Sequence, residues 1–559
     1  MSSSPLPSAL DAQTQTFPTL TPAQIARVRA AGKVRSVERG EVLFEPGQTN
    51  ISFYVLLSGA MEIVQPGLEG EKAVATHAPG EFTGELNMIS GRRSLVLGRI
   101  TESGEIIELR PDEFRALISR DAELSDVFMR AFILRRLILI QKGLGNLVLL
   151  GSQHSAQTLR LREFLTRNSQ PFVYMDLDAD SEAQELLDRF HVRREEIPVV
   201  VCGGGRRAAL RNPSIQHLAE CLGLNASIDQ TLIRDLVIVG AGPAGLAAAV
   251  YAASEGLDAL VIETAAPGGQ AGSSSKIENY LGFPMGISGQ ELAARAIAQA
   301  SKFGAQMMVA HSVARLECDK RPYNVVLDTG TKIAARALVI ATGAQYNKPG
   351  IENLERFEGL GVYYGATNME SQLCRGAEVI VLGGGNSAGQ AAVFLADTVR
   401  KVHMVVRSGR LADTMSRYLI QRIEENPAIE VHYGTELVRL EGDKQLERVH
   451  SRDKATGRIT VHEICHVFIM AGANPRTEWL RGCLALDPKG FILTGRDLDS
   501  ANGSSPWKLK RVPQMLETSL PGVFAVGDVR SGNVKRVASA VGEGAISIHM
   551  VHRTLAEME

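Results

Sequence analysis

The chain has 559 residues, of which 22% are charged and 45% are hydrophobic, and its formal net charge is -2 at pH 7. This length has room for about four domains with ordinary hydrophobic cores. The nearly neutral charge provides no sequence-independent attraction to nucleic acid, and no stretch reaches the about 18 apolar residues of a membrane span. Residues 1–20 lack the basic start and apolar core of a signal peptide, so we expect a flexible leader and a cytoplasmic protein.

From Gly40 to Glu108, short runs of alternating apolar and polar residues are broken by glycine, a pattern that predicts a small β-barrel or jelly roll. Residues 80–95 resemble the phosphate-binding cassette of cyclic nucleotide-binding domains. The resemblance implies that Glu85 holds a ribose hydroxyl, that Arg93 pairs with the cyclic phosphate and that Ser94 adds a hydrogen bond.

The predicted nucleotide site comprises Gly84, Glu85, Leu86, Arg93 and Ser94. Glu85 and Arg93 are slightly closer in sequence than in that family, and Leu95 stands where a smaller residue is common. Three interpretations stay open: a cyclic nucleotide, another nucleotide, or a vestigial pocket in which Arg92 and Arg93 are solvated. We assign residues 21–143 to this domain, including a helix at 121–142 that is apolar on more than one face. That helix is predicted to form a dimer or interdomain contact, or else to pack in its own core.

Residues 144–228 follow the strand order of a thioredoxin or glutaredoxin fold, which implies a cis Pro198 before the third strand. At the dithiol positions stand Ser152-Gln153-His154-Ser155, and serine cannot store electrons as a disulfide. The domain is predicted either to recognise a partner or dock on its neighbours, or to act as a spacer. His154 is interpreted as a surface residue.

A dinucleotide-binding unit begins with the apolar residues 236–239, which lead into Gly240-Ala241-Gly242-Pro243-Ala244-Gly245 and a helical stretch. These glycines permit a tight turn and a close approach of backbone N–H groups to a pyrophosphate. The next strand ends at Glu263, where an acid can accept ribose hydroxyl groups.

A second unit has the turn Gly383-Gly384-Gly385-Asn386-Ser387-Ala388, and its following strand ends at Arg407, with Arg410 close behind. Cations in place of the acid favour a 2′-phosphate, so this unit should prefer NADPH. Two such units suggest hydride transfer between two cofactors. The first should hold FAD, because residues 522–528 form a strand that ends in Gly527-Asp528.

With Gly268-Gly269-Gln270, Asn279 and Ala341-Thr342-Gly343 also in family order, residues 229–559 resemble the low-molecular-weight thioredoxin reductases. The resemblance implies an FAD domain at 229–346 and 474–559, an inserted NADPH domain at 347–473, and a segment 535–538 beside the isoalloxazine. The predicted FAD-binding residues are Gly240, Gly242, Pro243, Ala244, Gly245, Glu263, Gly269, Gln270, Asn279, Ala341, Thr342, Gly343, Gly527, Asp528, Lys535, Arg536, Val537 and Ala538. The predicted NADPH-binding residues are Gly383, Gly385, Asn386, Ser387, Ala388, Arg407 and Arg410.

The redox dithiol of that family is missing, because Ala366 and Met369 occupy its two positions. The nearest thiol is Cys374, which is either a weak catalytic candidate or a small buried hydrophobe. The other five cysteines lack the spacing of metal ligands, so no zinc site is expected, and all six are interpreted as unpaired. They are Cys202, Cys221, Cys318, Cys465 and Cys483.

The sequence therefore predicts a multidomain α/β flavoenzyme, a homodimer, that passes electrons from NADPH through FAD to an unidentified acceptor under cyclic nucleotide control. The acceptor is a small molecule or a redox protein. Two alternatives stay open: a thioredoxin-disulfide reductase that uses Cys374 or a partner dithiol, and a non-enzymatic sensor of redox state and nucleotides.

Overall fold

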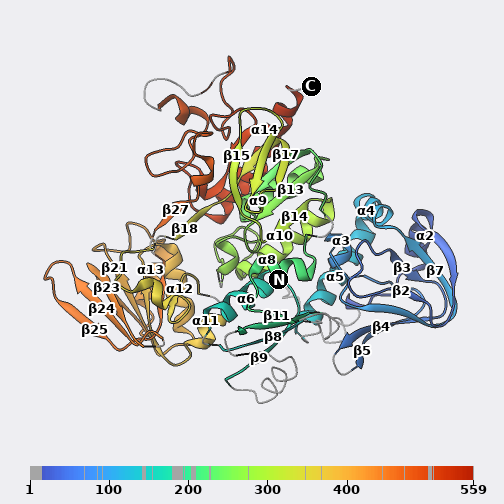
Figure 1. Cartoon of the computed structure of the whole chain (residues 1–559), viewed down its shortest axis with the longest axis horizontal. Helices are drawn as coiled ribbons and strands as arrows, with labels where there is room; N and C mark the ends of the chain where they lie inside the picture. The colour runs from blue at the N-terminus through green and yellow to red at the C-terminus, as the bar shows by residue number, and fades with distance from the viewer. Residues whose placement is uncertain are drawn as a thin grey trace, which may run out of the picture.

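The computed structural model describes residues 15–67, 70–84, 86–90, 92–141, 147–153, 155–178, 193, 196–202, 209–225, 228–274, 276–346, 348–366, 368–443, 445–470, 472–500, 507 and 509–557. Figure 1 shows an N-terminal β-rich lobe, a central lobe in green that is completed by the red C-terminal segment, and a further lobe in yellow and orange. Among the helices described, none is both long and apolar enough to cross a membrane.

The N-terminal lobe contains two antiparallel sheets that face each other across a core. Its helices are α2 (Pro22–Ala31), α3 (Leu86–Ser90), α4 (Pro111–Arg120) and α5 (Ala122–Gln141). One sheet has the order β1 (Lys33–Val37), β7 (Gly104–Leu109), β3 (Phe53–Leu56), and the other β2 (Val42–Phe44), β6 (Leu97–Glu102), β4 (Ala60–Gly67), β5 (Gly70–His77). Among the described strands no ladder joins the two sheets, so the predicted β-barrel or jelly roll is not closed. The inner faces instead pack together through apolar side chains such as Phe44, Tyr54 and Ile100.

Helix α5 is apolar on several faces because it serves two contacts. Phe128 and Phe132 are fully buried against Phe53 and Phe82, so most of its apolar surface belongs to the core of its own lobe. Farther along, the Arg136 guanidinium donates to the carbonyl of Ser169 in the next domain. The helix therefore combines core packing with an interdomain contact.

The part of the chain for which the sequence predicts a thioredoxin-like fold (the thioredoxin-like region) contains a four-stranded sheet and helices α6 (Ala156–Arg167) and α8 (Ile215–Leu222). Its order is β11 (Ala209–Arg211), β10 (Val199–Cys202), β8 (Leu147–Gly151), β9 (Val173–Asp176), with β8 and β9 parallel. The predicted cis peptide before Pro198 is present. His154 lies outside the described residues.

The central sheet has the order β14 (Gln306–Val309), β13 (Ala259–Glu263), β12 (Arg234–Val239), β17 (Lys332–Ile340), β16 (Tyr323–Leu327), β15 (Val313–Glu317), and β28 (Val523–Ala525) also pairs with β17. Helices α9 (Pro243–Ser254), α10 (Gly289–Phe303) and α14 (Val537–Ala556) accompany it. Short 3-10 turns are η2 (Ala271–Ser273), η4 (Glu478–Leu480), η5 (Gly495–Ser500) and η6 (Gly527–Val529). β17 and β28 are neighbours in this sheet although they are far apart in the sequence. Part of the segment between them forms a separate lobe.

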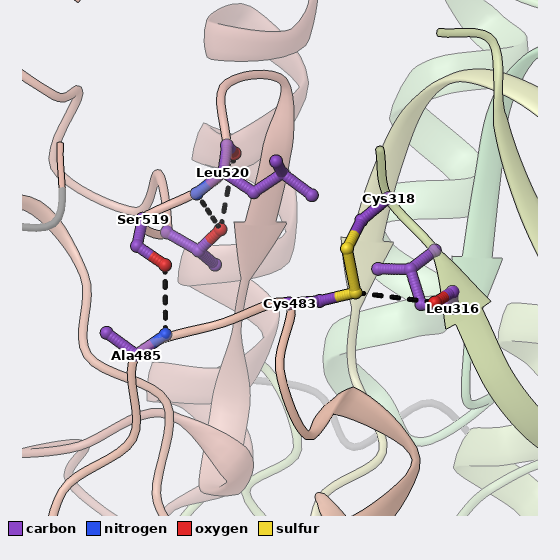
Figure 2. Close-up of a disulfide and its surroundings, with 7 residues drawn as sticks. Leu316, Cys318, Cys483, Ala485, Ser519 and Leu520 are labelled. Carbon is purple, nitrogen blue, oxygen red and sulfur yellow. Dashed lines mark hydrogen bonds between the residues drawn. A yellow bond between two sulfur atoms is a disulfide. The ribbon is translucent and has the colours of Figure 1, made fainter. Parts of the chain in front are cut away.

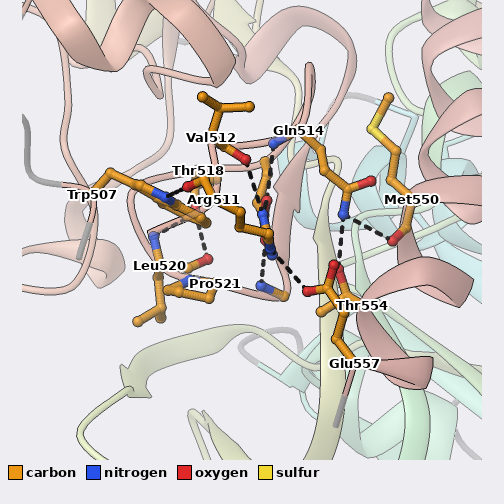
Figure 3. A network of polar contacts seen from close by, with 12 residues as sticks. Trp507, Arg511, Val512, Gln514, Thr518, Leu520, Pro521, Met550, Thr554 and Glu557 are labelled. Atoms are coloured by element: carbon orange, nitrogen blue, oxygen red, sulfur yellow. Dashed lines mark hydrogen bonds and ion pairs between the residues drawn. The ribbon is translucent and has the colours of Figure 1, made fainter. Parts of the chain in front are cut away.

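A buried ion pair fixes the C-terminal segment (Figure 3). The fully buried Glu517 carboxylate accepts two hydrogen bonds from Arg511, at 2.7 and 2.8 Å, and further ones from the backbone N–H groups of Gln514 and Gly522. Arg511 also reaches Glu557, just after α14. The segment before β28 is thereby tied to the last helix.

This separate lobe, the inserted lobe, is connected to the central lobe through two paired strands, β18 (Ala344–Tyr346) and β27 (Ala473–Pro475). Its parallel sheet has the order β19 (Val362–Tyr363), β26 (Val467–Ile469), β20 (Glu378–Leu382), β21 (Lys401–Val406), β22 (Ile429–Tyr433). Helices are η3 (Leu354–Phe357), α11 (Asn368–Leu373), α12 (Asn386–Ala396) and α13 (Arg417–Glu424). A small sheet adds β23 (Thr435–Glu441), β24 (Arg448–Asp453) and β25 (Ile459–His462).

Two cysteines are joined, contrary to the prediction that all are unpaired. Cys318, directly after β15, forms a disulfide with Cys483, close to η4, across a sequence separation of 165 residues (Figure 2). The prediction failed because the pairing depends on β15 lying beside a segment from the other side of the inserted lobe.

Candidate functional site

A single cleft of about 1040 Å³ collects residues from the central lobe, the inserted lobe and the thioredoxin-like region. Its volume is at the upper end of the range for small-molecule sites, which suits a dinucleotide better than a fragment. Of the predicted FAD-binding residues, all except Gly245 and Ala538 line it. The sequence motifs, although spread over some 300 residues, therefore meet at one place.

The first turn is shaped by glycines that bring β12 and α9 together. Gly240 has a left-handed backbone with φ of +104°, and a Cβ atom on Gly245 would stand 1.9 Å from the carbonyl oxygen of Gly240. Gly245 therefore acts through close packing, which explains why it lies behind the cleft wall. Helix α9 starts at Pro243 with its positive end at the cleft, where an anionic pyrophosphate is favoured.

Three polar side chains at this site are suited to a bound nucleotide. The Glu263 carboxylate, at the end of β13, accepts hydrogen bonds from Ala241 N–H at 2.8 Å and Ala265 N–H at 3.1 Å. Thr342 Oγ1 is buried and has no hydrogen-bond partner among the described residues, so it offers a free donor to a ligand. Burial raises the pKa of Asp528, and Lys535 opposes this effect.

The inserted lobe reaches the same cleft through the first turn of α12. Asn386 and Ser387 line it, whereas Gly383, Gly385 and Ala388 do not. Gly383 packs closely against the Met470 carbonyl group, because a Cβ atom on Gly383 would stand 2.6 Å from the carbonyl oxygen. Both turns thus open toward one space.

The two predicted phosphate-binding cations lie at the carboxyl end of β21. Arg407 and Arg410 are exposed, and Arg410 forms an ion pair with Asp413 at 2.7 Å. Neither lines the cleft itself. They are accessible to a phosphate group at the outer end of a nucleotide.

The segment at the family's dithiol positions borders the cleft without a thiol at either position. Tyr364 and Gly365 line the cleft, and Ala366 follows them as a buried residue. Met369 lies in α11, and its side chain is outside the described set. Cys374 is fully buried in the apolar core of the inserted lobe, and burial, with a smaller effect of Glu370, raises the pKa of its thiol to about 12. In this conformation Cys374 is therefore a protonated core residue, which argues against it as an electron exit.

Helix α6 of the thioredoxin-like region also lines the cleft, a feature that the sequence did not indicate. Ala156, Leu159, Arg160, Glu163 and Arg167 contribute to the wall. Figure 1 shows α6 between the central lobe and the inserted lobe. Helix α6 therefore lies at the wall of the cleft, as expected for a region that docks on the reductase lobes.

Arg167 anchors this docking, because its guanidinium donates to the Gly269 carbonyl at 3.0 Å and to the Ala266 carbonyl at 3.3 Å. Gly269 is itself one of the predicted FAD-binding residues. A side chain of the thioredoxin-like region is therefore in contact with the loop that borders the cleft.

The N-terminal lobe holds the thioredoxin-like region through arginines at helix C-termini. Arg93 donates to the carbonyl of Cys221 in the last turn of α8, and Arg92 donates to the Asn168 carbonyl at the end of α6, both at 3.3 Å. Cations are favoured at this end of a helix. The interpretation of Arg92 and Arg93 as solvated is therefore wrong, since both are half-buried between domains.

Two other cassette residues, Gly84 and Ser94, form hydrogen bonds within the N-terminal lobe. The Ser94 hydroxyl donates to the Val96 carbonyl at 2.7 Å, and the Gly84 carbonyl accepts from Arg135 of α5 at 3.0 Å. Leu86 begins α3, with its side chain outside the described set, and Glu85 is not among the described residues.

Two strand, glycine turn and helix units that open on one cleft define a class of oxidoreductases that use two dinucleotides. The sequence model for pyridine nucleotide-disulphide oxidoreductases matches residues 234–544, and the model for cyclic nucleotide-binding domains matches residues 34–121. Thioredoxin reductase from Mycolicibacterium smegmatis is 32% identical over 333 residues, which is 60% of this chain and 100% of that protein.

Solved structures agree with this relationship. Lactococcus lactis thioredoxin reductase, in a form described as the FR conformation, has 28% identity and a TM-score of 0.52, and covers 58% of this chain and 99% of its own. The T. acidophilum thioredoxin reductase has 29% identity and a TM-score of 0.51 with the same coverage. The chain belongs to the pyridine nucleotide-disulphide oxidoreductase family and is an FAD-dependent oxidoreductase of the thioredoxin reductase-like kind, with a cyclic nucleotide-binding domain in front.

Proposed function

We propose that the chain is an FAD-dependent NADPH oxidoreductase. Electrons enter from NADPH, pass to FAD and leave to an acceptor outside the chain. The observation that carries this proposal is the shared cleft, which is lined both by the predicted FAD-binding turn and by the first turn of α12. When bound, the two cofactors supply hydride transfer, and the protein supplies their binding and orientation.

The residues present fit both groups. The N-terminus of α9 and the unpartnered Thr342 hydroxyl suit the pyrophosphate and ribityl part of FAD, and Glu263 suits its adenosine ribose. Arg407 and Arg410 suit the 2′-phosphate that distinguishes NADPH from NADH. Arg407→Ala should therefore raise the KM for NADPH while leaving that for NADH little changed.

We further propose that the acceptor takes electrons directly at the cleft, because the adjoining segment at Ala366 has no dithiol and Cys374 is buried. Acceptors of this kind are oxygen, a quinone, a free flavin, an iron–sulfur protein or a partner disulfide. A thioredoxin-like partner is suggested by the names of the relatives, and homodimerisation and a cytoplasmic location stay predictions of the sequence.

Nucleotide control is proposed to act through Arg93. A cyclic phosphate would compete with the Cys221 carbonyl for this guanidinium, and so weaken the contact between the N-terminal lobe and α8. A helix C-terminal cation contributes about 0.3–1 kcal/mol, so a ligand of moderate affinity is sufficient to displace it. Calorimetry with cyclic AMP and cyclic GMP tests this: binding that is lost in Arg93→Gln supports it, and equal binding by both proteins contradicts it.

The function itself is tested by adding NADPH to the purified protein without oxygen and recording the flavin absorbance near 450 nm, followed by a screen of acceptors with and without cyclic nucleotide. Bleaching by NADPH with turnover on at least one acceptor is expected. No bleaching would contradict the electron entrance, and bleaching without turnover on any acceptor would favour a sensor.

A further inference from the structure

A group of histidines and glutamates lies in the inserted lobe, apart from the cleft. His403 stands on β21, Glu430 and His432 on the neighbouring edge strand β22, and His462 at the end of β25 in the small sheet. The Gly383 turn follows the carboxyl end of β20, whereas Glu378 of the group is the first residue of that strand. The group lies along β21 and β22, where they are covered by the small sheet, and none of its members lines the cleft.

Two ring nitrogens, which are hydrogen-bonded to each other, and a carboxylate oxygen lie close together. His403 Nδ1 and His432 Nε2 are 3.0 Å apart, and His432 Nε2 is 3.7 Å from Glu430 Oε1. Ligand atoms of these three residues all lie within 4.8 Å of one another. Two imidazole nitrogens bound to one tetrahedral Zn²⁺ at about 2.0–2.1 Å would be roughly 3.3 Å apart, so only a few tenths of an ångström separate this arrangement from a metal site.

The atoms on the far side of these groups are already held. The other ring nitrogen of His403 is 3.2 Å from Glu378 Oε2, and the other oxygen of Glu430 forms an ion pair with Lys401 at 2.5 Å. Metal-binding histidines usually donate their second nitrogen to a carboxylate in this way, which fixes the ring and makes the inner nitrogen available to the metal.

His462 closes the third side of the group. Its ring centroid is 6.1 Å from that of His403 and 6.3 Å from that of His432, and its Nε2 is held by the Ser451 hydroxyl at 2.8 Å. The space between the two sheets is thus bordered by imidazole rings, the ligand type that suits zinc and its neighbours in the first transition series.

We propose that His403, His432 and Glu430 bind a divalent transition-metal ion, with Zn²⁺ the best match, and a water molecule in the fourth position. The ion would join the edge strand β22 to β21 and so stabilise the inserted lobe. The site has no role in the electron path described above, and its test is independent of flavin reduction.

The test uses the full-length, tag-free holoprotein after removal of metals by a chelator. Zn²⁺ is titrated in competition with a chromophoric chelator, and the thermal unfolding midpoint is recorded with and without the ion. His432→Gln is the main variant, because this half-buried side chain can be replaced without opening the core, and Glu430→Gln, at an exposed carboxylate, is the second. His450→Gln is the matched control, since His450 lies on β24 of the small sheet and contacts Glu441 instead.

Wild type and His450→Gln should each bind one Zn²⁺ per chain. His432→Gln and Glu430→Gln should bind this ion more than tenfold more weakly. Zn²⁺ should raise the unfolding midpoint only of the proteins that bind it. The four cysteines outside the disulfide are the same in all four proteins, so their zinc uptake cancels in the comparison. Equal zinc affinity in wild type and the two cluster variants, or no zinc binding by wild type, would overturn the proposal.

Discussion

Removal of the disulfide between Cys318 and Cys483 should destabilise the central lobe. The double variant Cys318→Ser/Cys483→Ser opens a covalent loop of 165 residues, which includes the whole inserted lobe. In the chain-entropy model, closing a loop of this length lowers the entropy of the unfolded chain by the equivalent of about 5 kcal/mol at 25 °C. If the inserted lobe stays folded when the central lobe opens, the effective loop is shorter, so the expected loss is about 2–5 kcal/mol.

The assay is urea unfolding followed by flavin release, which reports on the central lobe, and by far-UV circular dichroism. The variant should release flavin at lower urea, and reductant should shift wild type toward the variant. Cys221→Ser, at a half-buried cysteine outside the disulfide, is the control and should remain within about 0.5 kcal/mol of wild type. An unchanged flavin-release midpoint in the double variant, or peptide mapping without reductant that finds no Cys318–Cys483 link, would refute the reasoning.

Three further predictions concern single residues. Iodoacetamide at pH 8 should leave Cys374 unmodified until the protein is denatured, because burial holds its pKa at about 12, and rapid labelling of the native protein, read by mass spectrometry, would show that the thiol is accessible. Glu517→Gln should cost about 3–5 kcal/mol in urea unfolding because it leaves the Arg511 cation facing a neutral amide, whereas the exposed Glu557→Gln should cost less than about 1 kcal/mol; equal losses would contradict this. Gly245→Ala should yield protein with little bound flavin, since its Cβ atom meets the Gly240 carbonyl, while Gly542→Ala in α14, which meets nothing within 4 Å, should keep its flavin, as absorbance spectra would show.

Short sequence motifs predicted those parts of the site that are formed by consecutive residues. The turn from Gly240 to Gly245 needs only a strand, close backbone packing and a helix start, and the glycines carry that requirement in six consecutive residues. The cis peptide at Pro198 was expected only from the resemblance to a thioredoxin or glutaredoxin fold.

Features that depend on docking were not predictable from local sequence. In the sequence, Arg167 is an ordinary charged residue of a helix. Only the position of α6 in the structure brings it to the Gly269 carbonyl. Cys318 and Cys483 lie on either side of an inserted lobe, and His403 and His432 belong to neighbouring strands separated by a helix. In each case the two residues are far apart in sequence, and the sequence of one protein does not show that they are neighbours in space.

The central claim is that electrons enter from NADPH and leave FAD without an internal dithiol. The most direct measurement is a stoichiometric titration of the flavin with NADPH in the absence of oxygen. The Cys318–Cys483 disulfide does not line the cleft, so FAD should be the only two-electron acceptor within reach, and bleaching should be complete at about one equivalent of NADPH per flavin. An end point near two equivalents would reveal a second two-electron centre, such as a redox-active disulfide, and would contradict the account.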